Sequence, residues 1–279
     1  VEWRLIEGKI FNFVFWTFKP CIDGFAHCRP VISIDGTHVY GAYDIKLLIA
    51  IGMDANGSIF PLAFAIAANE SNDTWGIFLT HLKTHVIKDR TGICVLSDRH
   101  KGILHNMANL PGWQPPFVYH RYCLRHLKAN LQSTFHNDTL NKLMWGAAME
   151  HQQRKWAAKM DLIRAVSEPA YVWLMKLEVE KWTLHADGGK RWGMLTTNSS
   201  ESFNGLLKSA RGLPVTAMVR MTFKQVVERF VVRTRQARAI LADGGTWMPK
   251  PFKNMEHYRK KMRASPNDRV WPNSTCVWS

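Results

Sequence analysis

Three apolar stretches follow one another in the first quarter of the chain, which is typical of buried strands. They are residues 30–35, 45–54 and 58–67. Asn56-Gly57 predicts a tight turn between the second and third stretches. Pro61 predicts an edge position or a bulge at the start of the third. Because the three strands come in immediate succession, we expect an antiparallel meander.

The pattern then changes to alternating helices and strands. Apolar positions from Trp75 to Val86 recur every three or four residues and predict a helix, with Asn72 or Asp73 as its N-cap. Further along, the pattern predicts a strand, a helix and a short strand, at residues 91–98, 99–110 and 115–120. Strands joined through helices are expected to add to the sheet in parallel.

The rest of the chain reads as helical, apart from its loops. Residues 123–180 have no strand signal, and residues 182–200 form a loop rich in Gly, Ser and Thr. Glu201 opens a short predicted helix, and residues 216–241 predict a second. The tail from Gly244 has no clear period, and residues 1–29 read as an extended or loop-like lead-in. The fold class is therefore a mixed α/β sheet with a helical block placed late.

Two carboxylates stand out at predicted strand ends. Asp35 ends the first strand and Asp98 the fourth, so neighbouring strands would bring them together. Carboxylates held close repel one another unless a cation lies between them, and hard oxygen ligands suit Mg²⁺ or Mn²⁺. The alternative is turn chemistry, since Asp before Gly is common in turns. Pattern alone leaves these two interpretations open.

The positive net charge of the chain favours an anionic partner. Lys and Arg number 37 against 22 Asp and Glu, a formal net charge of +15. Residues 203–264 alone hold 14 basic and 3 acidic residues. Nucleic acid is the first candidate partner and an anionic membrane surface the second. We expect the phosphate-binding face in the C-terminal third.

Composition excludes other classes. Hydrophobic residues make up 46% of the chain, enough for a sizeable core. The five cysteines are odd in number and scattered, which favours a reducing compartment over a disulfide-bonded secreted protein. No apolar stretch approaches the roughly 20 residues that span a bilayer, and the first residues lack a signal-peptide pattern.

A Cys/His cluster and a basic segment complete the candidate chemistry. His120, Cys123 and His126 are spaced to share one face of a helix. Zinc normally takes four ligands, and no second pair lies nearby, so a structural or DNA-proximal role is favoured over zinc. The basic segment, residues 222–241, is either the solvated face of a helix or a surface that binds DNA phosphates. The local excess of positive charge favours phosphate binding. The candidate DNA contacts are Arg229, Arg233, Arg235 and Arg238 in this segment and, before it, Lys208 and Arg211.

Five stretches in order resemble the catalytic domain of plant Mutator-like (MULE-type) DDE transposases. They are CIDGFAHCRPVISIDGTHVYG, KLLIAIGMDANGSIFPLAFAIAANESNDTWGIFL, VLSDRHKGI, HRYCLRHLKAN and TTNSSESFNGLLKSAR. The resemblance implies a ribonuclease H-like fold with Asp35, Asp98 and Glu201 as the catalytic, metal-binding triad. These acids are 63 and 103 residues apart, and the second gap implies a helical insertion. Cys123 and His126 match the family's C-x-x-H element.

The position of the third acid is the least secure part of the resemblance. Glu201 also suits the first turn of a helix, where the dipole favours an acid. The competing third acids lie in the helical block and are Glu150, Glu168, Glu178 and Glu180.

The expected organisation follows from this resemblance. It comprises a lead-in (1–29), the first part of the core (30–122), a helical insertion (123–195), the completion of the core (196–242) and a basic, truncated tail (243–279). The expected activity is cut-and-paste transposition with two Mg²⁺ or Mn²⁺ ions, by a nuclear homo-oligomer on DNA and not at a membrane.

Two other functions stay open. One is a domesticated DNA-binding regulator that no longer transposes, and the other is a different nuclease of the same fold. The zinc-finger modules that family members often carry are not found in this sequence, so recognition of transposon ends by this chain alone is in doubt.

Overall fold

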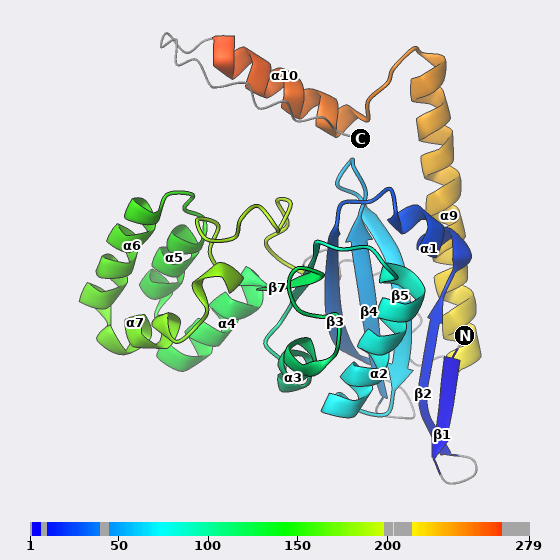
Figure 1. The fold of residues 1–279 in the computed structure, drawn as a ribbon, viewed down its shortest axis with the longest axis horizontal. Coiled ribbons are helices and arrows are strands. Elements are labelled where there is room, and N and C mark those ends of the chain that lie inside the picture. The colour runs from blue at the N-terminus through cyan, green and yellow to red at the C-terminus, as the bar shows by residue number, and fades with distance from the viewer. Residues whose placement is uncertain (1, 7–9, 40–44, 198–202, 204–213, 264–279) are drawn as a thin grey trace.

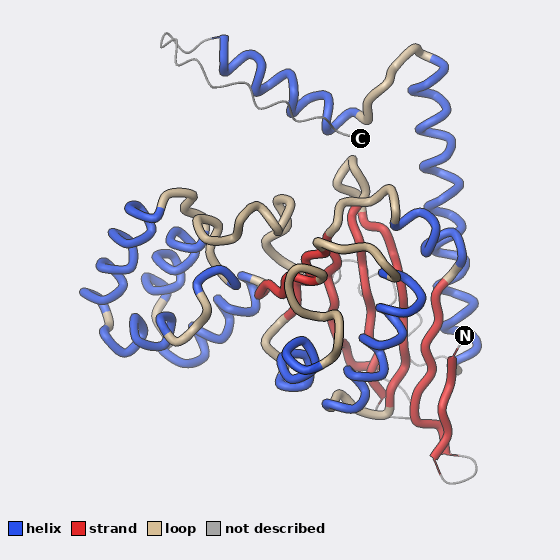
Figure 2. The backbone as a smooth tube through the Cα atoms, in the orientation of Figure 1, coloured by secondary structure: helices blue, strands red, loops and turns tan. Residues whose placement is uncertain are grey.

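A single mixed sheet forms the centre of the molecule (Figures 1 and 2). The computed structural model describes residues 2–6, 10–39, 45–197, 203 and 214–263. The sheet has seven strands in the order β1-β2-β5-β4-β3-β6-β7. Their bounds are β1 Glu2–Ile6, β2 Ile10–Thr17, β3 Val31–Val39, β4 Ile45–Met53, β5 Ile59–Ala67, β6 Ile93–Ser97 and β7 Val118–Tyr122.

The predicted meander and the two parallel additions are confirmed. β3, β4 and β5 pair antiparallel, whereas β6 pairs parallel with β3, and β7 with β6. The bulge expected at Pro61 is present, because Ala50 pairs with Ala63 while Ile51 pairs with Pro61. β5 as a whole lies between β2 and β4, but its ladder with β2 covers only Ala63 to Ala67, so Pro61 pairs with β4 alone and lies at a local edge as well. The mixed α/β class therefore holds.

The N-terminal segment differs from the prediction. Residues expected to be loop-like form β1, β2 and the helix α1 Lys19–Phe25. β2 pairs with β5, and its aromatic side chains Phe13, Phe15 and Trp16 are buried. A run of aromatic residues lacks the alternation of apolar and polar residues that marks a half-exposed strand. Such a run is expected where a strand is buried on both faces of the sheet.

Helices cover both faces of the sheet. Phe15 packs against Phe78 of α2 Asn72–Leu82, with ring centroids 5.8 Å apart. The next residue, Trp16, points to the opposite face and donates to Thr222 Oγ1 of α9 Val215–Ala242 at 3.0 Å. Adjacent strand residues face opposite sides. The α2 layer and the α9 layer therefore enclose the sheet, and α3 Lys101–Asn109 lies beside α2.

The N-cap of α2 is one residue earlier than predicted. Ser71 accepts from the Thr74 backbone, and Thr74 Oγ1 accepts from the Ser71 backbone at 2.9 Å. This reciprocal capping box satisfies two terminal donors together, which a lone Asn72 or Asp73 would not. The helix continues as η1 Lys83–Ile87.

The predicted helical block follows β7 and has a core of its own (Figure 1). It consists of α4 Leu124–Phe135, α5 Asp138–Ala148, α6 Gln153–Val166 and α7 Glu168–Met175, followed by the short η2 Val179–Lys181. Leu127, Met144 and Trp182 are among its buried side chains. Leu124 N donates to Leu195 O at 3.0 Å, so the chain enters and leaves the block at one place.

The C-terminal part contains one unpredicted helix. α9 matches the helix predicted over 216–241, whereas α10 Pro249–Arg263 occupies a tail in which no period was expected. The described side chains of α10 are almost all exposed, so no apolar stripe marks it in the sequence. Across the described part of the chain, no helix is long and apolar enough to cross a bilayer.

Candidate active site

Asp35 and Asp98 each lie two residues beyond the last pair of the parallel β3–β6 ladder. The β3–β6 ladder pairs Val31 with Cys94 and Ser33 with Leu96. In this ladder each residue of β3 lies opposite the residue 63 positions later in the chain. Extending the same register two residues past Ser33 aligns Asp35 with Asp98. The predicted convergence of the two strands is present in the ladder.

The environment of Asp35 differs from the prediction. Asp35 does not end its strand, because β3 continues to Val39 and Asp35 pairs with Ile49 of β4. Only the ladder to β6 stops before Asp35. β6 ends at Ser97, so Asp98 is the first residue beyond it. The long partner β4 keeps β3 extended after β6 has diverged.

Cys123 continues the same row on the third parallel strand. β7 pairs Ser97 with Tyr122, so the next position sets Cys123 beside Asp98. Cys123 N donates to Ser97 O at 2.7 Å and fixes this register. Extended past their last pairs, the β3–β6 and β6–β7 registers align Asp35, Asp98 and Cys123 in one row, and the charges of both Asp35 and Asp98 act on His126.

The row also fixes which face of the sheet carries Asp35. Asp35 pairs with Ile49, Ile49 with Phe64, and Phe64 with Trp16. Paired residues share a face of the sheet, and Trp16 points to α9. Asp35 therefore lies on the α9 face, away from α2, whereas Asp98 Oδ1 accepts from the backbone of His100, the N-cap of α3, at 3.0 Å.

Cys123 accepts a set of hydrogen bonds that stabilises its thiolate. Thr197 donates to Cys123 Sγ through its backbone N at 3.2 Å and its Oγ1 at 3.3 Å. Burial would raise the pKa of Cys123, but these bonds and those from His126 outweigh it and lower the pKa to about 7. The hydrogen bond to Cys123 raises the pKa of His126 to about 9 against the opposing effect of burial, and the charges of Asp35 and Asp98 raise it further.

His120 does not share a face with Cys123 and His126, contrary to the prediction. His120 lies in β7, Cys123 is the N-cap of α4, and only His126 lies within the helix. His120 Nε2 lies 2.8 Å from Ser97 Oγ, and burial lowers the pKa of His120 to about 3. α4 begins at Leu124, four residues after His120, which separates the three side chains.

Gly36 serves the packing around Glu70. A Cβ at Gly36 would lie 2.8 Å from Glu70 Oε1, which also accepts from Trp75 Nε1 at 3.1 Å. The space beside Gly36 is therefore filled by a carboxylate. Glu70 was not singled out by sequence, since an acid before a helix N-terminus has an ordinary explanation.

Glu201 lies outside the described residues, as do Lys208 and Arg211. The described residues nearest to Glu201 in sequence are Thr197 and Phe203. Thr197 binds Cys123, and Phe203 is fully buried against Phe64, with ring centroids 5.7 Å apart. Both flanking residues thus contact the row of the sheet that holds Asp35 and Asp98.

Three of the competing third acids are engaged within the helical block. Glu150 pairs with Lys159, Glu168 with Arg164 at 3.4 Å, and Glu178 with Lys181 at 2.5 Å. The fourth, Glu180, is exposed within η2. None of them belongs to the strand row of Asp35 and Asp98.

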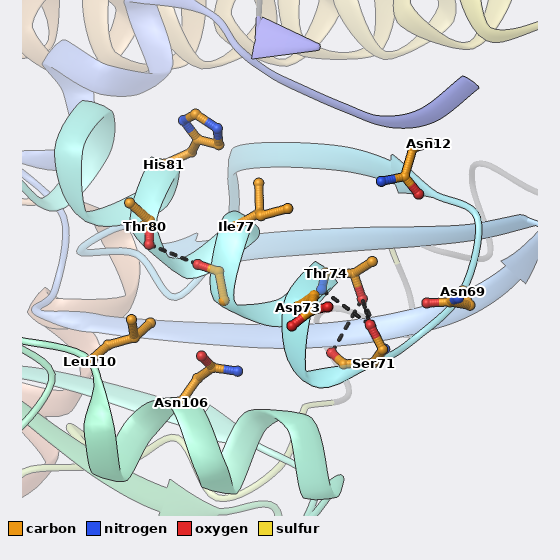
Figure 3. A pocket seen from close by; sticks show the side chains of 11 residues that line it. Asn12, Asn69, Ser71, Asp73, Thr74, Ile77, Thr80, His81, Asn106 and Leu110 are labelled. Carbon is orange, nitrogen blue, oxygen red and sulfur yellow. Dashed lines mark hydrogen bonds between the residues drawn. The ribbon is translucent and has the colours of Figure 1, made fainter. Parts of the chain in front are cut away.

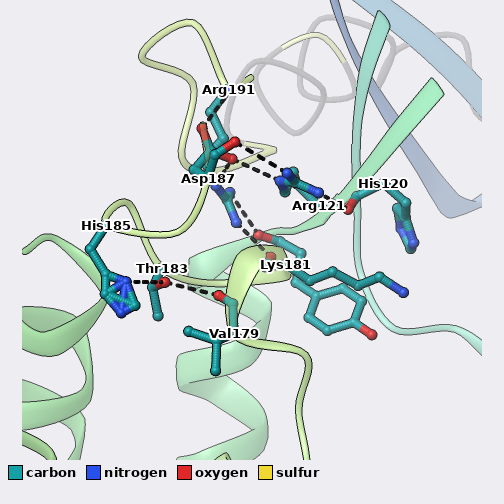
Figure 4. Close-up of polar contacts among 9 residues, drawn as sticks. His120, Arg121, Val179, Lys181, Thr183, His185, Asp187 and Arg191 are labelled. Atoms are coloured by element: carbon teal, nitrogen blue, oxygen red, sulfur yellow. Dashed lines mark hydrogen bonds and ion pairs between the residues drawn. The ribbon is translucent and has the colours of Figure 1, made fainter. Parts of the chain in front are cut away.

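A buried ion cluster holds the chain that leads from the helical block back to this row (Figure 4). Asp187 Oδ1 accepts from Arg121 Nε of β7 at 2.7 Å, and Asp187 Oδ2 accepts from Arg191 N at 2.9 Å. Arg191 Nη1 donates to Tyr122 O at 3.0 Å. No sequence signal marks Asp187, because its partners are 66 and 4 residues away.

The predicted basic residues fall into two groups. Arg229 lies over the ring of Phe203 at 5.1 Å, and burial lowers its pKa. Arg233 donates to Ile59 O and lies 3.7 Å from Asp54. These two residues hold α9 to the sheet, whereas Arg235 and Arg238 are exposed.

A polar cavity lies away from the acids. It has a volume of about 630 Å³ and lies between α2, α3 and β2, with Asn12, Ser71 and Asn106 among its lining residues (Figure 3). Asn106 Nδ2 donates to Asn72 O and Gly102 O, both at 2.8 Å. Its polar groups are used in joining α2 to α3, so we place the candidate chemistry at the acids.

The donor set of the acidic row suits a hard cation. Asp35 and Asp98 supply carboxylate oxygens, which Mg²⁺ and Mn²⁺ prefer. Within the described ranges, no three His, Cys, Asp or Glu side chains group as a metal site. The two acids fit such an ion as part of a larger ligand set.

Comparison with known proteins agrees with this geometry. The family model described as the MULE transposase domain matches residues 31–130, which span β3 to the first half of α4 and include Asp35, Asp98, Cys123 and His126. A comparison with curated proteins finds no significant match. Residues 31–130 of this chain are therefore similar to the MULE transposase domain.

Proposed function

We propose that this chain is the catalytic part of a DDE-type DNA transposase with a ribonuclease H-like fold. The observation that carries the proposal is the β3–β6 register, in which Asp35 and Asp98 each follow the last paired residue by two positions. That register gives two carboxylates one position at the end of a parallel ladder, where α/β sheets tend to bind ligands. The MULE match over the same strands supports DNA as the substrate.

In this proposal Asp35, Asp98 and Glu201 hold two divalent cations. Glu201 is preferred as the third acid because Thr197 and Phe203, its described neighbours in sequence, contact the row of Asp35 and Asp98. When bound, Mg²⁺ or Mn²⁺ would activate the attacking water or 3′-hydroxyl and stabilise the leaving oxygen. The acids fix the positions of the ions, and His126 adds positive charge beside them.

DNA binding would use the exposed basic residues of α9. Arg235 and Arg238 are exposed, and the segment around them carries a strong excess of positive charge. Contacts of this kind bind phosphates with strong salt dependence and little sequence preference.

A cleavage assay tests the proposal. End-labelled duplex DNA with Mg²⁺ or Mn²⁺ should be cut by the parent chain, and Asp35→Asn, Asp98→Asn and Glu201→Gln should each lower the rate by at least about 100-fold. Asp89→Asn, at an exposed position next to η1, serves as the matched control and should cut like the parent.

Other outcomes separate the alternatives. Equal cutting by the Asp35 and Asp98 variants would overturn the site. Tight DNA binding by the parent without cutting under any metal would favour the domesticated regulator. If Glu201→Gln cuts normally while the two Asp variants do not, the third acid lies elsewhere.

A further inference from the structure

Arg99 is a half-buried cation that directly follows Asp98. The turn that carries it is fixed on both sides, since His100 N donates to Asp98 Oδ1 at 3.0 Å and Gly102 N donates to His100 Nδ1 at 3.1 Å. Arg99 therefore leaves the end of β6 in a defined direction and not from a mobile loop.

The Arg99 guanidinium lies on an aromatic ring of the helical block. Its Cζ is 4.7 Å from the centroid of Trp173 in α7. Trp173 is itself held edge-on by Phe135 of α4, with centroids 6.3 Å apart. A guanidinium stacked on tryptophan keeps its edge nitrogens available for an anion.

Arg99 has no anionic partner among the residues that the structure describes. Its Nε is buried without a hydrogen-bond partner, and no described carboxylate forms an ion pair with it. The buried arginines Arg121 and Arg191 differ from the half-buried Arg99, because they share Asp187 as an anionic partner. Burial lowers the pKa of Arg99, while Tyr122 and Asp98 act in the opposite direction through their charges. A buried cation without a partner is costly, so a bound anion would stabilise this arrangement.

We propose that Arg99, stacked on Trp173, binds a backbone phosphate of DNA next to the Asp35–Asp98 site. This inference rests on the proposed function, because that function supplies a polyanion at Asp98. A planar guanidinium can engage a phosphate with two parallel hydrogen bonds. Arg99 lies in the turn between β6 and α3, and Trp173 lies in the helical block, so one phosphate contact would involve both parts of the molecule.

The test is DNA binding by the whole 279-residue chain in EDTA, so that cleavage plays no part. Fluorescence anisotropy with a labelled duplex is followed over a range of salt concentrations. Arg99→Gln should weaken binding roughly tenfold at low salt and reduce the slope of log K against log salt by about 1. Arg99→Lys keeps the charge but loses the planar fork, so it should fall between Arg99→Gln and the parent.

Two further variants control the interpretation. Arg154→Gln removes one exposed charge from α6 of the same block and should change affinity far less than Arg99→Gln. Trp173→Leu leaves the net charge unchanged and should still weaken binding. Thermal unfolding should show that Arg99→Gln is at least as stable as the parent, because the cation that it removes has no anionic partner among the described residues.

The proposal is overturned if Arg99→Gln matches the parent in affinity and salt slope, or if Arg154→Gln loses as much affinity. Loss of affinity accompanied by a lower melting temperature would also overturn it, in favour of a structural role. Asp35→Asn separates this inference from the proposed function. If the parent cuts DNA and Asp35→Asn does not, while Arg99→Gln binds normally, only the phosphate site fails. If the parent binds no DNA, both fail.

Discussion

Arg121 Nε donates to Asp187 Oδ1 at 2.7 Å, and these two side chains keep only 7% and 2% of their surface exposed. Asp187 also lies 3.5 Å from Arg191 Nε, so one carboxylate serves two buried cations. The cluster ties β7 to the segment that ends at Thr197, which contacts the row of the candidate site.

Asp187→Asn should destabilise the protein strongly. The substitution leaves two buried guanidinium groups without a counter-charge, a loss of about 3–5 kcal/mol in the free energy of unfolding. Urea denaturation measures it. Asp23→Asn is the matched control, because its ion pair with Lys19 is exposed, at 57% and 83%, and should contribute less than about 1 kcal/mol. Similar losses in both variants would show that burial does not govern the Asp187 cluster.

Gly36→Ala should destabilise the fold by roughly 1–3 kcal/mol, because the new methyl group would overlap the Glu70 carboxylate. A double-mutant cycle tests this cause. In a Glu70→Ala background the same glycine substitution should cost much less, since the overlapping group is gone. An equal cost in both backgrounds would mean that the backbone of β3, and not Glu70, requires glycine.

The thiolate of Cys123 should titrate well below the other thiols. Its pKa is lowered to about 7, whereas burial raises those of Cys21, Cys28 and Cys94 to about 12. In a Cys276→Ser background, ultraviolet thiolate absorbance should therefore rise in one step near pH 7. Cys123→Ser should remove that step, and His126→Gln should move it to higher pH. A step that survives Cys123→Ser would belong to another thiol.

Cys123 and His126 have opposite effects on how the stability of the protein depends on pH. The stabilisation from Cys123 is fully present above its unfolded pKa near 9 and is lost as pH falls through about 7. That from His126 is present below its unfolded pKa near 6.5 and is lost as pH rises through about 9. Between pH 7 and 9 the two slopes oppose, so the pair should leave the stability of the parent nearly flat there.

Apolar runs predicted the strands well because burial on both faces leaves little room for polar residues. β4 and β5 are buried along almost their full lengths, and their bounds match the predicted stretches closely. β3 was predicted too short, since Asp35, Gly36 and Thr37 interrupt the apolar run while β4 keeps the ladder intact. Pairing with a neighbouring strand is a tertiary effect that a local pattern does not contain.

The candidate site was predictable only in part. Asp35 and Asp98 could be found because both follow apolar runs on strands that pair. The surroundings depend on contacts over long sequence distances, such as Thr197 with Cys123, and no spacing rule indicates them. The prediction for His120 was wrong because the regular spacing of His120, Cys123 and His126 spans the boundary between β7 and α4. The three residues therefore do not belong to one helix.

The common entry and exit of the helical block has a consequence for how this chain can vary. Leu124 bonds to Leu195, and Cys123 to Thr197, so about 70 intervening residues begin and end at neighbouring points. Helices in such a segment can be lengthened, lost or exchanged without shifting any strand of the sheet. Differences in length and sequence between related chains should therefore accumulate within the helical block, while the spacing from Asp35 to Cys123 stays constant.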